Sequence, residues 1–491
     1  MSETLILNGK DLTLEDLYSV VYDRRPVQID PEVIPLVDKS RQVLFDMAAD
    51  GKPVYGLNHG VGWNKDREFS QDFFEQYNRN LINSHSLGVA PFASVEEVRA
   101  MMCIRLNTAL CGRTGIASNI LKMYEEFLNR GIHPRAMRRG AVGEGDVSTM
   151  SMIGQAMIGQ GEVEYHGEII PAIDAMRAEG IEPAILGPKD GLSIVSSNAQ
   201  GESMVVLLVK EVEELIKLSD AIYCLHLEGL NGGLQPLGER VNEVRGLPGQ
   251  IHCAAECRRF LEGSYLEHPD SKRALQDPLS FRCGAAINGS VYDSLEYVKK
   301  ILELQINRTD DNPCILYEEG TTSVSPNFEV TTLSLGVDML AAALCHMSHA
   351  ITNRLYKIVD PGFTVLICQL QRLAHLLQGF QTIFFHIYKV AVLEPVEFSF
   401  PIITGQNFHQ LFPRHILRRH CQLQQVAAHG NSNGYAGRRQ NPHFFQRIGN
   451  IHLTDCRKLH DSFCQETIKQ FVVLINNHFF FQIIISIAIG A

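Results

Sequence analysis

Two long stretches with helical periodicity limit what this chain can fold into. Between residues 199 and 229, apolar side chains recur at helical spacing, at Val205, Leu208, Val212, Leu215 and Ile222. Residues 329–357 carry almost no charge over several turns, which predicts a helix buried on all sides, as in the core of a bundle. The chain is therefore predicted to be mainly α, with long central helices, glycine loops at their ends and few strands.

Shorter signals place further elements before these helices. Capping-box patterns at residues 13–16 and 94–97 predict two helix starts, and residues 163–170 predict a small hairpin. The helix that starts near residue 95 has an apolar stripe that Arg105 interrupts. We therefore expect this helix to be buried unevenly along its length.

Composition excludes some classes of function. A net charge of −11 argues against general binding of nucleic acid, which requires a basic surface. The first residues lack a cationic start before an apolar run, and the 12 cysteines have irregular spacing, which predicts a cytoplasmic protein with free thiols. Cys253 and Cys257, beside His252, suggest a metal site, but no second ligand pair follows at zinc spacing. Buried thiols are the preferred interpretation, and no metal is predicted.

The glycine-rich stretch at residues 140–148 is the strongest local signal for a functional site. It reads Gly-Ala-Val-Gly-Glu-Gly-Asp-Val-Ser and precedes residues 149–160, which are uncharged and apolar at helical spacing. Such a turn at the start of a buried helix presents free N–H groups and the positive end of the helix dipole, which suits an anion or an electrophile. A glycine loop that serves only packing is an equally good interpretation.

The composition changes near residue 365. Residues 1–364 contain 33 Lys and Arg against 50 Asp and Glu, whereas residues 365–491 contain 11 against 5, together with 10 of the 19 histidines. The last segment shows no sustained periodicity, and polar residues interrupt its apolar end at 471–491, which argues against a membrane span. We interpret residues 365–491 as an aberrant C-terminal segment, which a shift of reading frame would explain. The other predicted regions are 1–195, with the glycine loops, and 196–364, the central bundle.

Seven motifs in order resemble the histidine, phenylalanine and tyrosine ammonia-lyase family over most of residues 5–364. One such motif would be weak evidence, whereas seven in the same order are strong evidence. They are Tyr55-Gly-Leu-Asn-His-Gly-Val-Gly62, Asn80-Leu-Ile-Asn-Ser-His-Ser-Leu-Gly-Val89, Asp190-Gly-Leu-Ser-Ile-Val-Ser-Ser-Asn-Ala-Gln200, Gly249-Gln250, Gln276-Asp-Pro-Leu-Ser-Phe-Arg-Cys283, Asp311-Asn-Pro313 and Asn327-Phe328.

The resemblance implies a helix bundle of the fumarase/aspartase-like type and a homotetramer whose active sites each draw on three subunits. It implies that Tyr55 removes the β-proton of an amino acid, so that ammonia leaves. Since a free phenol stays protonated near neutral pH, this role requires nearby positive charge or helix dipoles. His85 would read the substrate side chain, Arg282 would clamp its carboxylate, and Phe328 would line the pocket. Each could instead be structural.

Three departures from the family pattern change the expected chemistry. The family forms a methylidene-imidazolone electrophile from Ala-Ser-Gly, but this chain has Gly143-Glu144-Gly145, and glutamate cannot dehydrate to that group. Ser197 and Asn198 stand where the family has Asn-Gly, and Leu279 replaces a second catalytic tyrosine. The aberrant segment also replaces the C-terminal helices, which predicts poor assembly of the tetramer.

Three functional hypotheses follow. The first is a carbon–nitrogen lyase of the histidine or tyrosine type with weak or absent deamination. The second is an enzyme that binds an amino acid and acts without the electrophile, with Tyr55 and Glu144 as an acid–base pair and Ser197 and Asn198 near the substrate. A carboxylate at a helix N-terminus favours its anionic form, so Glu144 suits a base or an ammonium binder better than an acid; it could also be a capping or solvated side chain. The third is a non-catalytic scaffold or binding protein.

Overall fold

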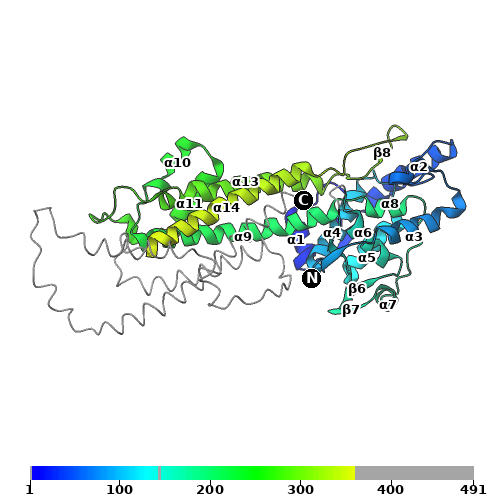
Figure 1. Cartoon of the computed structure of the whole chain (residues 1–491), viewed down its shortest axis with the longest axis horizontal. Helices are drawn as coiled ribbons and strands as arrows, with labels where there is room; N and C mark the ends of the chain where they lie inside the picture. The colour runs from blue at the N-terminus through cyan, green and yellow to red at the C-terminus, as the bar shows by residue number, and fades with distance from the viewer. Residues whose placement is uncertain (1–2, 142–144, 360–491) are drawn as a thin grey trace, which may run out of the picture. The chain divides into compact units, whose positions relative to one another are not determined.

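The computed structural model describes residues 3–141 and 145–359, which belong to one compact unit, and it confirms the mainly α fold (Figure 1). The helices before the bundle are α1 (Leu14–Tyr22), α2 (Ile34–Ala49), α3 (Phe74–His85), α4 (Val95–Leu110), α5 (Ser118–Arg130), α6 (Val147–Met157), α7 (Ala172–Ala178) and α8 (Asp190–Val195). The later helices are α9 (Ala199–Leu230), α10 (Glu239–Arg245), α11 (Pro248–Phe260), α12 (Leu279–Arg282), α13 (Gly284–Gln305) and α14 (Thr331–Val359).

The long helices α9, α13 and α14 run side by side along this unit (Figure 1). The predicted helix at 199–229 is confirmed as α9, which ends where Asn231 adopts the left-handed conformation. Helices α4 and α6 pack against α9, as do α11 and α12. Helix α9 thus connects an amino-terminal region that holds the glycine loops to a second region built from α10–α12.

The strands are short and pair into small sheets beside the helices. Strand β1 (Leu5–Leu7) pairs in parallel with β2 (Val27–Ile29), so that Leu5 faces Val27. The antiparallel pairs are β3 (Val89–Phe92) with β5 (Met137–Arg139), β4 (Ile132–Pro134) with β6 (Glu162–Tyr165), β6 with β7 (Glu168–Pro171), and β8 (Cys314–Leu316) with β9 (Thr321–Ser323). The β6–β7 pair confirms the predicted hairpin.

Both predicted capping boxes start helices, but the expected uneven burial of α4 was wrong. Thr13 accepts a hydrogen bond from Asp16 N at the start of α1, and Ser94 and Glu97 form the full reciprocal box at the start of α4. Every residue of α4 from Glu97 to Leu110 is buried, Arg105 included. Arg105 does not break the buried surface because its guanidinium ends in ion pairs inside the protein.

The prediction that residues 329–357 are buried on all sides was also wrong for the single chain. Helix α14 packs one face into the bundle, through residues such as Leu340 and Met347, while Leu335 is 62% exposed on another.

Two segments are long and apolar enough to cross a membrane, namely α14 and the segment from α8 through α9. Helix α9 is largely buried, and core helices of soluble proteins can have the same length and composition. The aberrant segment 365–491 lies outside the described residues, and the boundary at residue 196 stays a prediction.

Candidate active site

A buried charged centre lies near the start of α9. It consists of Arg105 from α4, Lys189 just before α8, and Asp310 and Asp311, which precede β8. Arg105 Nη1 lies 2.8 Å from Asp310 Oδ1, and its Nη2 lies 3.2 Å from Asp311 Oδ2. Lys189 Nζ lies 3.3 Å from Asp311 Oδ1. Burial opposes the charge of Arg105, but Asp310 and Asp311 outweigh it and raise the pKa of the guanidinium.

The charged centre holds two helix starts together. The Asp310 carboxylate accepts hydrogen bonds at 2.8 Å from Ser197 Oγ and from the Asn198 backbone N–H. Asp146, the residue before α6, donates its backbone N–H to Ser197 O at 2.6 Å and accepts from Gly201 N–H at 2.8 Å. The amino ends of α6 and α9 therefore meet, and the positive ends of both helix dipoles lie in one region.

Two carboxyl groups at this junction are perturbed by burial. Burial raises the pKa of Asp146 to about 6, although hydrogen bonds from backbone N–H groups in the first turn of α9 lower it in part. Burial and the Asp310 and Asp146 carboxylates raise the pKa of Glu202 well above its ordinary range, which favours its neutral acid form. Asn198 Oδ1, Gln200 Oε1 and Glu202 Oε2 are buried and have no hydrogen-bond partner among the described residues. Unpaired buried polar atoms are rare in protein interiors, and here they are positions that water or a ligand can satisfy.

Tyr55 lies on its glycine loop at the same end of the unit. Its phenolic oxygen accepts a hydrogen bond from Gly62 N–H at 2.9 Å, which fixes the position of the ring. The loop packs directly on α8, because a side chain at Gly56 would collide with Leu192. Glycine is required there by contact and by its positive φ of 75°.

His85 ends α3 and lies beside the start of the 140–148 loop. Helix α3 packs against α6 and α8, and a Cβ at Gly140 would lie 2.9 Å from Leu87 O. His85 Nδ1 lies 2.8 Å from Leu81 O. Since a carbonyl can only accept, this contact uses Nδ1 as the donor and leaves Nε2 available to a ligand.

The structure does not place Arg282 near Tyr55, His85 or the start of α9 in the same chain. Arg282 ends α12 and donates to Gln276 Oε1, and its neighbour Phe281 accepts a hydrogen bond from Tyr223 Oη at 2.6 Å. Tyr223 follows Asn198 by about seven turns of α9, so the two lie roughly 38 Å apart at about 1.5 Å per residue. Within one chain, Arg282 is therefore far from Ser197, Asn198 and the loops that precede them.

The remaining predicted residues have less defined surroundings. Phe328 is half-buried and follows Ser325, whose hydroxyl donates to Asp311 O at 2.9 Å, so its loop is tied to the charged centre. Leu279 is exposed beside Arg282. Glu144 lies outside the described residues, together with Val142 and Gly143.

The residues of this chain do not fit formation of the family's prosthetic group. Residues 141–146 read Ala-Val-Gly-Glu-Gly-Asp and contain no serine. The neighbouring hydroxyls are already engaged, because Ser148 Oγ donates to Gly140 O at 3.1 Å and Ser197 Oγ donates to Asp310. Neither serine stands between alanine and glycine, as cyclisation of Ala-Ser-Gly requires.

Sequence reasoning missed most of the buried groups that organise this junction. Arg105 was noticed only as an interruption, and Asp310 precedes a recognised motif by one residue. Asp146 is part of the stretch 140–148 but was given no role, and Glu202 follows the third glycine-loop motif. A charged residue inside an otherwise apolar helix was the available signal for Arg105 and Glu202, whereas Asp146 and Asp310 lie outside helices.

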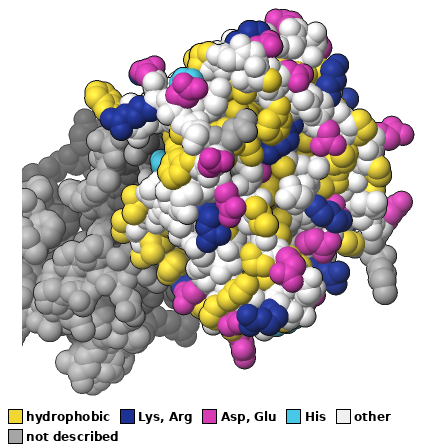
Figure 2. Space-filling view, turned by 90° about the vertical axis from the view of Figure 1, so that its right-hand side faces the viewer, with side chains coloured by type: hydrophobic (Ala, Val, Ile, Leu, Met, Phe, Trp, Pro, Cys, Tyr) yellow, Lys and Arg dark blue, Asp and Glu magenta, His cyan; other side chains and the backbone are white. Residues whose placement is uncertain are grey.

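The end of the unit that carries α2, α3 and α8 presents charges of both signs interspersed with apolar side chains (Figure 2). Substrate recognition on this side must therefore come from individual side chains and helix ends rather than from one broad charged surface.

Comparisons with known proteins agree with this arrangement. A sequence model described as aromatic amino acid lyase matches residues 12–390. The histidine ammonia-lyase of Geobacillus thermodenitrificans is 34% identical over 359 residues, which cover 73% of this chain and 71% of that protein. A crystal structure of an ergothioneine-degrading enzyme, ergothionase, from Treponema denticola in complex with desmethyl-ergothioneine sulfonic acid is 50% identical, with 81% of each chain covered and a TM-score of 0.73. Tyrosine aminomutase from Streptomyces globisporus is 25% identical, with 74% of this chain and 72% of that chain covered and a TM-score of 0.67.

Proposed function

The chain belongs to the aromatic amino acid lyase family, and on that premise we propose that it eliminates an amine from a histidine-derived betaine, such as ergothioneine, without a prosthetic electrophile. The observation that carries this proposal is the 50% identity to ergothionase over 81% of the chain. The absence of serine from residues 141–146 supports it.

The chemistry of a betaine removes the need for an electrophile. The α-nitrogen of ergothioneine carries three methyl groups and a permanent positive charge, so it has no lone pair to add to an electrophile. When a base takes the β-proton, the C–H electrons form the Cα=Cβ bond and the Cα–N bond breaks. Trimethylamine leaves with the bonding pair, and the product is an α,β-unsaturated acid. An α-ammonium group can instead lose a proton and become a neutral amine, which would have to leave as an anion, and this is why activation helps in deamination.

We assign roles to residues on this basis. Tyr55 is the base, held by the Gly62 N–H at 2.9 Å. His85 reads the five-membered ring of the substrate through its free Nε2. Glu144 precedes α6 by three residues in the sequence, where the helix N-terminus favours a carboxylate in its anionic form, and we assign it to the quaternary ammonium. Asn198 Oδ1 and Gln200 Oε1 are polar atoms available to the substrate or to loop 142–144.

The complete site requires more than one subunit in this proposal. Arg282, the carboxylate clamp, adjoins Phe281, whose hydrogen-bond partner Tyr223 lies roughly 38 Å along α9 from Asn198 in the same chain. An exposed apolar face on α14, which includes Leu335 and Met339, offers a surface for another copy. We therefore propose a homotetramer in which Arg282 of one subunit serves the Tyr55 of another.

The test measures both products of the reaction with the purified full chain. We expect ergothioneine to release trimethylamine and to produce the near-ultraviolet absorbance of an unsaturated acid, while histidine, tyrosine and phenylalanine release no ammonia. Tyr55→Phe should lower the rate by about 10²- to 10⁴-fold, as for loss of a general base. Tyr22→Phe, at an exposed tyrosine on α1, is the matched control and should retain the rate.

The alternative is histidine deamination, which the 34% identity to histidine ammonia-lyase favours. Ammonia from histidine at enzyme-like rates, together with an intact mass lower by two waters, would overturn our proposal. If the chain converts none of these substrates but still binds ergothioneine, the result would instead support a binding protein.

Assembly is tested by mixing two inactive variants. Tyr55→Phe and Arg282→Ala chains, unfolded and refolded together, should regain part of the activity if each site draws on two subunits. Activity that stays absent in mixed oligomers, confirmed by sedimentation, would contradict the shared site. A chain that remains monomeric would contradict the proposed tetramer and agree with the poor assembly predicted from residues 365–491.

A further inference from the structure

A second buried cluster of reactive side chains lies in the other half of α9, away from the candidate active site. We call Asp220, Cys224, Cys253 and Cys257 the thiol cluster. Helix α9 contributes Asp220 and Cys224, and α11 contributes Cys253 and Cys257. In each helix the two residues are four positions apart, so they lie on one face, one turn apart. All four side chains are buried.

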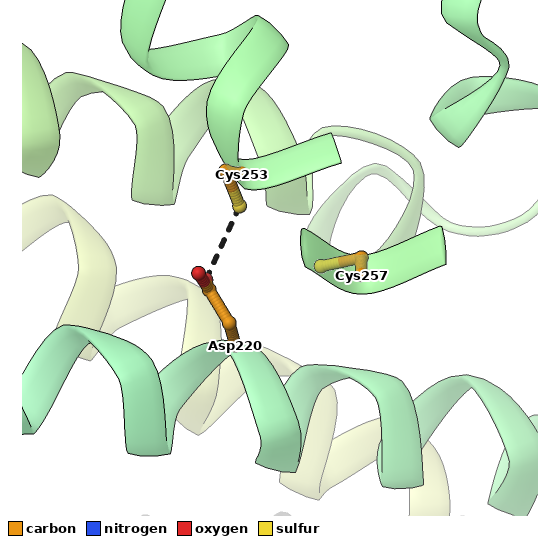
Figure 3. Close-up of side chains that lie close together, drawn as sticks. All are labelled: Asp220, Cys253 and Cys257. Carbon is orange, nitrogen blue, oxygen red and sulfur yellow. Dashed lines mark hydrogen bonds between the residues drawn. The ribbon is translucent and has the colours of Figure 1, made fainter. Parts of the chain in front are cut away.

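The ligand atoms of this cluster converge. Figure 3 shows Cys253 Sγ pointing from α11 toward the Asp220 carboxylate on α9, and this distance is 3.2 Å. The ligand atoms of Asp220, Cys253 and Cys257 all lie within 4.8 Å of one another. Ligands at about 2.0–2.3 Å from a tetrahedral Zn²⁺ stand roughly 3.3–3.8 Å apart. Small side-chain movements are therefore sufficient for one ion to contact all three.

We propose that the thiol cluster binds a thiophilic divalent metal ion, with Zn²⁺ as the ion that matches its donors. Cys253, Cys257 and Asp220 provide three ligands, and Cys224 lies next to this group, with its Sγ 3.7 Å from the Cys257 carbonyl oxygen. Cysteine sulfur and carboxylate oxygen are both ligands that Zn²⁺ accepts. The ion would clamp α9 to α11.

The surroundings of Asp220 support a cation. Asn288 Nδ2 and Tyr292 Oη, both on α13, donate to its two oxygens at 2.7 and 2.8 Å. Such hydrogen bonds orient a metal-binding carboxylate. Within the described residues, no lysine or arginine forms an ion pair with Asp220. A buried carboxylate without a positive partner is costly, and a divalent ion would remove that cost.

The charges around the thiols also suit a divalent ion. Arg354 lies close enough to Asp220, Cys253 and Cys257 to interact with them electrostatically. Cysteine binds a metal as the thiolate. One divalent ion together with Arg354 would balance two thiolates and the Asp220 carboxylate.

The test measures metal content and ligand chemistry in the full chain. The protein is purified with Zn²⁺, dialysed and analysed for metal, and a second sample is loaded with Co²⁺. We expect about one equivalent of metal per chain and, with Co²⁺, the sulfur-to-cobalt charge-transfer band of thiolate ligation. The Cys253→Ser/Cys257→Ser variant should lose both signals. Cys103→Ser, at a buried free thiol on α4, should keep both.

Two outcomes would overturn the proposal. Cobalt without a thiolate band would place the ion on other ligands, for which the 10 histidines of residues 365–491 are candidates. A band that persists in the double variant would exclude the thiol cluster. If the double variant fails to fold, Asp220→Asn replaces it and should weaken Co²⁺ binding by about 10-fold or more. Unchanged Co²⁺ affinity in Asp220→Asn would also contradict the proposal.

Discussion

The two halves of α9 each hold buried polar groups, but their charges are balanced in different ways. The charged centre near its start pairs two cations with two carboxylates inside the protein, and one of its carboxylates, Asp310, also accepts hydrogen bonds from Ser197 and Asn198. The thiol cluster in its other half surrounds Asp220 with neutral donors. The first is balanced by its own ion pairs, whereas Asp220 in the second has no ion-pair partner within the described residues.

This difference assigns different roles to the two clusters. A balanced centre can fix the positions of two helix starts, because its geometry does not depend on any binding partner. The stability of a cluster with an unpaired carboxylate instead depends on whether a cation binds to it. We therefore regard the charged centre as the scaffold of the candidate active site and the thiol cluster as a separate, metal-dependent clamp.

The largest expected effect comes from breaking the charged centre. Arg105→Met would leave Asp310 without its cation in a buried site, and we expect a loss of about 3–5 kcal/mol in the free energy of unfolding, measured with urea. The matched control is Arg24→Met, which removes an exposed ion pair with Glu96 and should cost about 1 kcal/mol or less. Equal effects of the two changes would contradict the structural role of the charged centre.

The pH dependence of stability tests the thiol cluster without metal. Burial raises the pKa of Asp220 to about 6 from 3.8, so the folded state holds this proton more tightly than the unfolded state. The resulting stability is fully present below about pH 4 and is lost as the pH rises through about 6, by roughly 3 kcal/mol at most.

The measurement compares chelator-treated wild type with Asp220→Asn between pH 4 and 7. The advantage of the wild type should shrink as the pH rises, because asparagine does not ionise. Saturating Zn²⁺ should reverse this trend, since the metal binds the deprotonated ligands. A difference that does not change with pH in the chelated protein would show that Asp220 is not perturbed by burial.

A smaller effect is expected from one hydrogen bond to Asp220. Tyr292→Phe removes the donor to Oδ2, and we expect a loss of about 1–3 kcal/mol in the chelated protein. Addition of Zn²⁺ should reduce this loss, because the ion takes over part of the stabilisation of the carboxylate. Thermal unfolding with and without metal checks both statements, and a loss that Zn²⁺ leaves unchanged would weaken the metal proposal.

Much of the fold was predictable because its signals are local. Periodicity and the capping pairs at Thr13 and Ser94 located helices correctly, since both depend on residues within one or two turns. The misjudged helices, α4 and α14, show the limit of this approach. A polar residue such as Arg105 looks like a surface position until its partners more than 200 residues away are known, and an apolar helix looks like a core helix whether or not the same chain covers it.

The candidate site was predicted only in part. The loops that carry Tyr55 and His85 were identified by motif, and the structure places both at the end of the unit where α6 and α9 begin. The distance between this group and Arg282 could not be read from the motif order. Cys253 and Cys257 were considered for metal but set aside because no ligand pair follows them, whereas the pair that faces them precedes them, on α9.

The sequence alone determined the helical class, the loops and the absence of serine from residues 141–146, because these depend on side-chain periodicity and covalent chemistry. The tertiary structure decided that Arg105 meets Asp310, that Asp220 meets Cys253, and that Arg282 lies far from Tyr55 in one chain. Local patterns show which face of a helix is apolar, but the packing of the whole chain decides which other element that face contacts. For this reason the charges and thiols that distinguish the two halves of α9 became visible only in three dimensions.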